Sequence, residues 1–129
     1  MSRKKYNVII PADMKPRPKV HEETAAAILA NHFGSDVYFL ETGSHGGPDV
    51  KIGGVEWEIK SPDGSSPRTI QNNMRKAGHQ SGNVVIDLRR VKIHQRRAIG
   101  YIGQFMSGAS SKFKRVIVIT KLKKVLTIK

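Results

Sequence analysis

Two adjacent glycines inside an alternating stretch constrain the fold of this chain most strongly. In DVKIGGVEWEIK (residues 49–60), apolar and charged residues alternate on both sides of Gly53 and Gly54. Two-residue hairpin turns need backbone conformations that glycine adopts readily, and alternation with a period of two is typical of β-strands. The stretch therefore predicts a β-hairpin whose two strands each have an apolar side and a charged side.

The predicted turn also determines which residues of the two strands face each other. Counting outward from the glycines pairs Ile52 with Val55. Three pairs further out, Asp49 lies opposite Glu58. One face of the hairpin is then apolar and expected in the core, whereas the other is charged and carries Asp49, Lys51, Glu56, Glu58 and Lys60.

The facing carboxylates suggest a metal site. Like charges directly opposite each other cost from a few tenths of a kcal/mol to ~1 kcal/mol unless they are neutralised. A divalent cation would neutralise Asp49 and Glu58, since Mg²⁺ is typically held by one or two carboxylates together with waters and phosphates. Lys60 points to the same side, where it could help deprotonate a water or stabilise charge on a reacting phosphate. The alternative is a solvated face on which the acids form ion pairs with Lys51 and Lys60.

The charge of the chain indicates a polyanionic partner. Its net charge is +13 and its pI is near 10.4. No acidic residue follows Asp87, whereas eleven Lys and Arg lie between Arg89 and Lys124. We therefore expect a nucleic acid as the partner. A membrane surface is not expected, because Gly100 and Gly103 interrupt the apolar periodicity of the basic helical segment.

Several classes of site are excluded by composition. The chain has no cysteine, which rules out disulfides, thiolate zinc sites and cysteine nucleophiles. No apolar run approaches the ~18 residues that cross a bilayer. The N-terminal MSRKKYNVIIPAD is basic but lacks the apolar stretch of a signal peptide. We expect a soluble protein that acts in the cytoplasm.

The remaining pattern predicts one mixed α/β domain. Residues 1–18 contain three prolines and are expected as a basic arm with one short strand, and residues 19–129 as the single domain. Helices are expected over 19–34, 69–80 and 94–106, and strands over 37–41, 49–52, 55–60, 84–88, 115–120 and 125–128. This order predicts a mixed central sheet with helices on its faces.

The hairpin also carries a family resemblance. Pro48 and Asp49, followed after eight residues by Glu58-Ile-Lys60, resemble the PD-(D/E)xK nuclease motif, and the element order is similar to the restriction-endonuclease-like αβββαβ core. The resemblance implies a nuclease that hydrolyses phosphodiester bonds with Mg²⁺, or with Mn²⁺ or Zn²⁺. It implies that Asp49 and Glu58 bind the metal and that Lys60 is the catalytic base or an electrostatic stabiliser.

Many members of that superfamily place a further acid on the first helix. Glu22 and Glu23 are both available there. In archaeal Holliday-junction resolvases, to which this segment is similar, the glutamate lies eleven residues before the helix-ending glycine. Counting back from Gly34 therefore favours Glu23 as a catalytic and metal-binding residue. The alternatives are that both acids only stabilise the helix N-terminus, or that Glu41 completes the site.

A narrower resemblance extends over roughly residues 19–90. The run from VEWEIKSP to VVIDL is similar to the C-terminal nuclease domains of contact-dependent growth-inhibition toxins of the CdiA type. It implies a toxin that cleaves DNA or tRNA and is bound by a cognate immunity protein. It also makes Thr69 and Gln80 candidates for supporting the site, against the alternatives of a helix N-cap for Thr69 and a surface amide for Gln80.

Basic residues around the predicted second and third helices would hold a nucleic-acid backbone across the site. Together with Thr69 and Gln80, the candidates are Arg68, Arg75, Lys76, Arg89 and Arg90. Two other functions fit parts of the pattern. One is a metal-independent ribonuclease of the barnase, EndoU or colicin type, which would use His45, Lys60 or threonine residues for acid–base chemistry. The other is a basic nucleic-acid-binding protein without catalytic activity.

Overall fold

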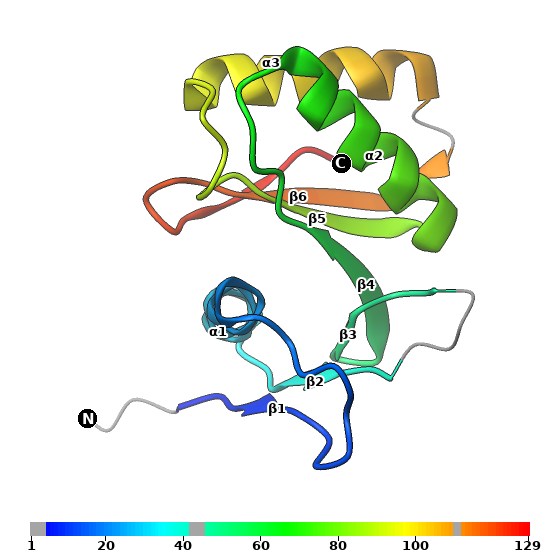
Figure 1. Cartoon of the computed structure of the whole chain (residues 1–129). Coiled ribbons are helices and arrows are strands. Elements are labelled where there is room, and N and C mark those ends of the chain that lie inside the picture. The colour runs from blue at the N-terminus through cyan, green and yellow to red at the C-terminus, as the bar shows by residue number, and fades with distance from the viewer. Residues whose placement is uncertain (1–4, 42–45, 110–111) are drawn as a thin grey trace.

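The computed structural model describes residues 5–41, 46–109 and 112–129. Figure 1 shows a strongly twisted sheet with helices on both faces. The helices are α1 (Val20–Phe33), α2 (Pro67–Gln80) and α3 (Gln95–Ala109). The strands are β1 (Val8–Ile9), β2 (Val37–Phe39), β3 (Val50–Ile52), β4 (Val55–Lys60), β5 (Asn83–Asp87), β6 (Arg115–Ile119) and β7 (Val125–Thr127). The predicted mixed α/β fold is confirmed.

The described strands form one seven-stranded sheet in chain order, from β1 to β7. The antiparallel pairs are β2 with β3, β3 with β4, and β6 with β7. The parallel pairs are β1 with β2, β4 with β5, and β5 with β6. Each parallel connection in the second half contains a helix, as such crossovers require. Strand β4 therefore lies at the centre, between an antiparallel neighbour and a parallel one.

The predicted hairpin is confirmed in its turn and in its register. Gly53 and Gly54 have φ angles of 55° and 82°, which are the positive values that a tight two-residue turn requires. Val50 pairs with Trp57 and Ile52 with Val55. Asp49 lies just outside this ladder, where its backbone N–H donates to the carbonyl of Trp57 at 2.9 Å and its side chain accepts from the N–H of Ile59.

Two clusters of buried residues lie on opposite faces of the sheet. In β5, Val84 and Ile86 pack with α2 and α3, whereas Val85 packs with α1. Figure 1 shows this division, with α1 on one face and α2 and α3 on the other. In β4, Trp57 and Ile59 belong to the α1 cluster, so Glu58 faces the side that α2 covers. The expected charged face is therefore not a solvated face at that position.

The helix ends follow the expected chemistry with one correction. Helix α1 ends at Gly34, whose φ of 62° is favourable for glycine and whose N–H donates to the carbonyl of Ala30. Helix α2 begins two residues earlier than predicted, with Ser66 as the N-cap and Pro67 in the first helical position. The alternative of an N-cap at Thr69 is therefore wrong, because Thr69 lies inside the first turn.

Part of the N-terminal segment joins the sheet and the core. Val8 and Ile9 pair in parallel with β2, and Met14 is only 8% exposed within the α1 cluster. Residues 5–18 thus contribute an edge strand and a buried side chain to the fold. Within the described ranges, none of the helices combines the length and apolar character that a membrane-spanning helix needs.

Candidate active site

Asp49 is held at the start of β3 by three hydrogen bonds. Its backbone N–H donates to the carbonyl of Trp57 at 2.9 Å, and its own carbonyl accepts from the N–H of Leu40 at 2.8 Å. Its side-chain Oδ2 accepts from the backbone N–H of Ile59 at 2.8 Å. The carboxylate is therefore fixed against the backbone of β4, next to Glu58.

Glu58 is an acid buried in the middle of the sheet. The residue is only 3% exposed. Its Oε2 lies 3.1 Å from Nζ of Lys60, whereas its Oε1 is buried without a hydrogen-bond partner in the described part of the chain. A buried carboxylate oxygen without a donor or cation is energetically costly. The site therefore lacks one positively charged or proton-donating group beside Glu58.

The protonation equilibrium of Glu58 reflects the same deficit. Burial, followed by hydrogen bonding and charge repulsion with Asp49, raises its pKa from 4.5 to about 8, although the ammonium of Lys60 acts in the opposite direction. The two carboxyl groups are thus close enough to share a proton. Either a proton or a cation between them would relieve the repulsion.

Lys60 lies at the rim of this site. Its side chain is 24% exposed, whereas that of Glu58 in the same ion pair is 5% exposed. The ammonium can therefore contact solvent or a ligand while it remains beside the carboxylate. The alternative of a solvated charged face fits Lys51 and Glu56, which are exposed opposite each other, but not Glu58.

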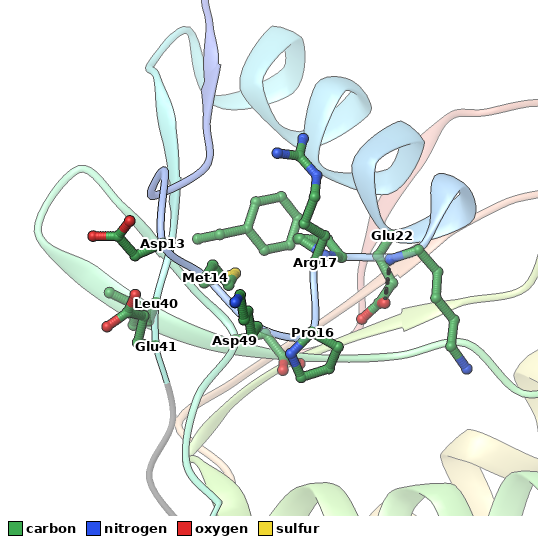
Figure 2. Close-up of a pocket in the computed structure, with 12 residues that line it drawn as sticks. Asp13, Met14, Pro16, Arg17, Glu22, Leu40, Glu41 and Asp49 are labelled. Atoms are coloured by element: carbon green, nitrogen blue, oxygen red, sulfur yellow. Dashed lines mark hydrogen bonds between the residues drawn. The ribbon is translucent and has the colours of Figure 1, made fainter.

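A cavity of about 430 Å³ opens beside Asp49. Its walls come from the end of β2, from α1 and from the segment Asp13–Lys19, as Figure 2 shows. Glu22 and Glu41 line this cavity together with Asp49, but Glu23 does not. Glu22 also accepts a hydrogen bond from the backbone N–H of Lys19 at 2.8 Å, so one of its oxygens caps the helix.

The carboxylates are not numerous enough for a cage made only of protein ligands. No group of three or more His, Asp or Glu side chains is placed to hold a metal ion among the residues that the structure describes. The pair Asp49 and Glu58 fits the smaller requirement of Mg²⁺, which keeps several waters and takes one or two carboxylates. His45 lies outside the described residues.

Two candidates from α2 and the loop before it have defined contacts. Oε1 of Gln80 accepts a hydrogen bond from the backbone N–H of Gly47, and a Cβ at Gly46 would lie 2.6 Å from that oxygen. Gln80 therefore holds the loop that leads into Asp49. Thr69 is half-buried, and its Oγ1 would lie 2.7 Å from a Cβ at Gly64. It packs against the linker between β4 and α2.

The predicted basic residues fall into two groups. Arg68, Arg75 and Lys76 are exposed on α2. Arg89, in contrast, is 15% exposed and paired with the buried Asp87. Arg90 is 37% exposed and pairs with Asp63 at 2.9 Å. The exposed group of three is available to a phosphate backbone, whereas Arg89 is engaged inside the protein.

Three features of the site were not predicted from the sequence. The segment Asp13–Lys19 forms a wall of the cavity. The Oγ of Ser61 is buried and has no hydrogen-bond partner in the described structure. Ser61 also lines a second, smaller cavity together with Glu22 and Arg90. Asp87 is completely buried. The only sequence signal for Ser61 was its position directly after Lys60, and for Asp87 its place at the end of an apolar strand.

Comparison with known proteins supports both the fold and the family. The chain is similar to a chain in the CdiA-CT/CdiI toxin and immunity complex from Burkholderia pseudomallei, with 23% sequence identity and a TM-score of 0.69 over 95% of this chain and 98% of that chain. No curated protein matches it at a significant level. The family model described as contact-dependent growth inhibition CdiA C-terminal domain matches residues 46–125, which include Asp49, Glu58 and Lys60. The chain therefore belongs to the family of contact-dependent growth-inhibition CdiA C-terminal domains, whose toxins are commonly nucleases.

Proposed function

We propose that this domain is a toxin nuclease of the PD-(D/E)xK type that hydrolyses phosphodiester bonds of DNA or tRNA with a bound divalent metal. The observation that supports the proposal most directly is the buried Glu58, which lies beside Asp49 and 3.1 Å from the ammonium of Lys60. Such a cluster is costly to fold and has no evident structural benefit, which is the usual signature of a functional site.

The residues present fit a divalent cation. The unpartnered Oε1 of Glu58 and the raised pKa of this carboxyl both indicate a missing positive charge. Asp49 and Glu58 would hold Mg²⁺, or Mn²⁺ or Zn²⁺. Of the two acids on α1, Glu22 and not Glu23 lines the cavity beside Asp49, where it would contact waters of the metal and not the ion itself. When bound, the metal would activate a water and neutralise charge on the reacting phosphate.

Besides the metal ligands, Lys60 and the backbone around Asp49 would contribute to the proposed reaction. The ammonium of Lys60 is exposed enough to donate to a phosphate oxygen while Glu58 holds its position. As the catalytic base, the same Nζ would instead accept a proton from the attacking water. The hydrogen bond between Ile59 and Asp49 keeps the Asp49 carboxylate oriented without substrate.

The exposed cations of α2 provide a surface for the substrate backbone. Arg68, Arg75 and Lys76 lie on the helix that covers the Glu58 side of the sheet. They would neutralise phosphates without reading sequence, so binding should weaken as salt increases. A cognate immunity protein is the expected protein partner, by analogy with the Burkholderia pseudomallei toxin and immunity complex.

Cleavage assays with matched variants test this function. The purified domain is incubated with plasmid DNA and with total tRNA in Mg²⁺, Mn²⁺, Zn²⁺ or EDTA. We expect metal-dependent cleavage of one substrate, lost in Asp49→Asn and Glu58→Gln. The control is Glu56→Gln, which removes an exposed carboxylate two residues earlier on the same strand and should cleave normally.

Three results would contradict the proposal. Undiminished cleavage by Asp49→Asn would show that the site lies elsewhere. Cleavage that survives EDTA would favour a metal-independent ribonuclease. A protein that binds nucleic acid, cleaves no substrate and is not stabilised by any of the metals would be a binding protein without catalytic activity.

A further inference from the structure

We propose that Arg89 is a positioning residue that holds the first turn of α1, and with it Glu22, against the end of β5. This inference rests on the proposed function, because it gives Arg89 an effect on catalysis through Glu22. It also replaces the expectation that Arg89 contacts nucleic acid.

The guanidinium of Arg89 is bound to Asp87 at both ends of the carboxylate. Nε lies 3.0 Å from Oδ1 and Nη2 lies 2.7 Å from Oδ2. The backbone N–H of Arg89 also donates to Oδ1 at 3.1 Å. Because Asp87 is completely buried, this bidentate pair supplies the charge compensation that a buried carboxylate requires.

The same guanidinium reaches across to another element. Nη2 of Arg89 donates to the backbone carbonyl of His21 at 2.8 Å. His21 lies in the first turn of α1 and directly precedes Glu22. A carbonyl oxygen has two lone pairs, so His21 can accept this bond in addition to a helical one. Arg89 therefore connects the end of β5 to the turn that carries Glu22.

The position of Glu22 depends on this turn. One of its oxygens caps the helix through the N–H of Lys19, and its side chain lines the cavity that also contains Asp49. If the first turn moves away from β5, Glu22 moves away from Asp49. The contact between Arg89 and His21 is thus a link between a buried ion pair and a carboxylate that lines the cavity beside Asp49.

Arginine is suited to this link and lysine is not. The planar guanidinium has five N–H donors in a fixed geometry, so it can bind a carboxylate and a carbonyl at once. A lysine could keep the charge beside Asp87 but would lose the second connection. Arg89 is also poorly placed for a phosphate, because its side chain is 15% exposed and its donors Nε and Nη2 are already used.

Steady-state kinetics of Arg89→Lys, Glu22→Gln and the double variant test the inference. Loss of a supporting contact around a metal site typically reduces activity about 10- to 100-fold. We expect Arg89→Lys to lower kcat to this extent, with KM and the salt dependence of KM unchanged. Added to Glu22→Gln, it should cause no further loss, because both variants remove the same contribution. The matched control is Arg115→Lys, because Arg115 is an exposed arginine at the start of β6 whose guanidinium donates a hydrogen bond to the side chain of Asn83.

A structural readout separates this inference from the proposed function. Hydrogen exchange of the α1 amides that bond to carbonyls at the start of the helix, such as the N–H of Glu23 to Lys19, should become about tenfold faster in Arg89→Lys and stay unchanged in α3, whether or not the protein cleaves nucleic acid. If Arg89→Lys does not fold, the pair Asp87→Asn with Arg89→Gln removes both buried charges together, and the same pattern is expected.

The outcomes have distinct meanings. A higher KM with a steeper or weaker salt dependence and unchanged kcat would show that Arg89 contacts the substrate. The inference would also be overturned if the losses of kcat from Arg89→Lys and Glu22→Gln multiplied in the double variant, or if hydrogen exchange in α1 stayed unchanged. Full activity of Asp49→Asn would instead refute the proposed function, while the exchange data would still decide whether Arg89 holds α1.

Discussion

Replacing Glu58 by glutamine should make the metal-free protein more stable at alkaline pH. The reason is the raised pKa of Glu58, which is about 8 in the folded protein compared with 4.5 for an unperturbed glutamate. Below pH 4.5 the carboxyl is protonated in both states, and its full contribution to stability is present. As the pH rises towards 8, the unfolded chain releases a proton that the folded protein retains, so the free energy of unfolding falls.

The size of this effect follows from the two pKa values. One pKa unit corresponds to 1.36 kcal/mol, so the difference between 4.5 and about 8 amounts to about 5 kcal/mol once the pH exceeds 8. Glutamine has a similar shape and carries no charge at any pH. We therefore expect the stability of Glu58→Gln relative to the wild type to increase by several kcal/mol between pH 5 and pH 8.5.

Urea unfolding in EDTA measures this difference. The chain has one tryptophan, Trp57, which is buried next to Glu58 in the same strand and should report unfolding by fluorescence. Other titrating groups are shared by both proteins, so they cancel in the difference. Glu56→Gln serves as the control, because Glu56 is exposed and its replacement should change stability little at any pH. A constant difference between Glu58→Gln and the wild type from pH 5 to pH 8.5 would refute the reasoning.

Three further predictions follow from the same structure. Adding Mg²⁺ or Mn²⁺ should raise the melting temperature of the wild type more at pH 8 than at pH 6, because the ion competes with the proton on Glu58. The same ions should not raise the melting temperature of Glu58→Gln. Thermal denaturation with and without EDTA measures both effects. Gly54→Ala should lower the free energy of unfolding by about 1–2 kcal/mol, because the φ of Gly54 is 82°. Gly100→Ala should raise it by about 0.5–1 kcal/mol, because Gly100 lies inside α3 with open space where a Cβ would stand. Urea unfolding of both variants measures these changes. Arg75→Gln should weaken nucleic-acid binding uniformly and reduce the slope of log K against log salt by about 0.7–0.9, if the exposed Arg75 contacts one phosphate; titrations at several salt concentrations test this.

The features that could be predicted from the sequence are those determined by neighbouring residues. The hairpin register depends on the two glycines and on the alternation that flanks them, and both are local. Helix boundaries depend on caps within a few residues, although α2 starts two residues before the predicted position because Ser66, and not Thr69, is its N-cap.

The remaining features depend on residues far apart in the chain. The burial of Glu58 requires α2 to cover β4, and alternation alone cannot reveal such a cover. Glu22 and Glu23 point about 100° apart on a helix of 3.6 residues per turn, so only the docking of α1 decides which of them lines the cavity with Asp49. The internal role of Arg89 likewise depends on a carbonyl of α1 that lies 68 residues away in sequence.

The order of the strands has a consequence for how the molecule folds. Because β1 to β7 follow one another in the sheet as they do in the chain, each pairing joins strands adjacent in sequence, and the hairpin of β3 and β4 closes the shortest loop. Local pairings of this kind tend to form early. Asp49 and Glu58 would then meet before α2 has covered Glu58, so their repulsion would act on the folding barrier itself. Refolding should therefore be faster at a pH where Glu58 is protonated than at a pH where it is ionised.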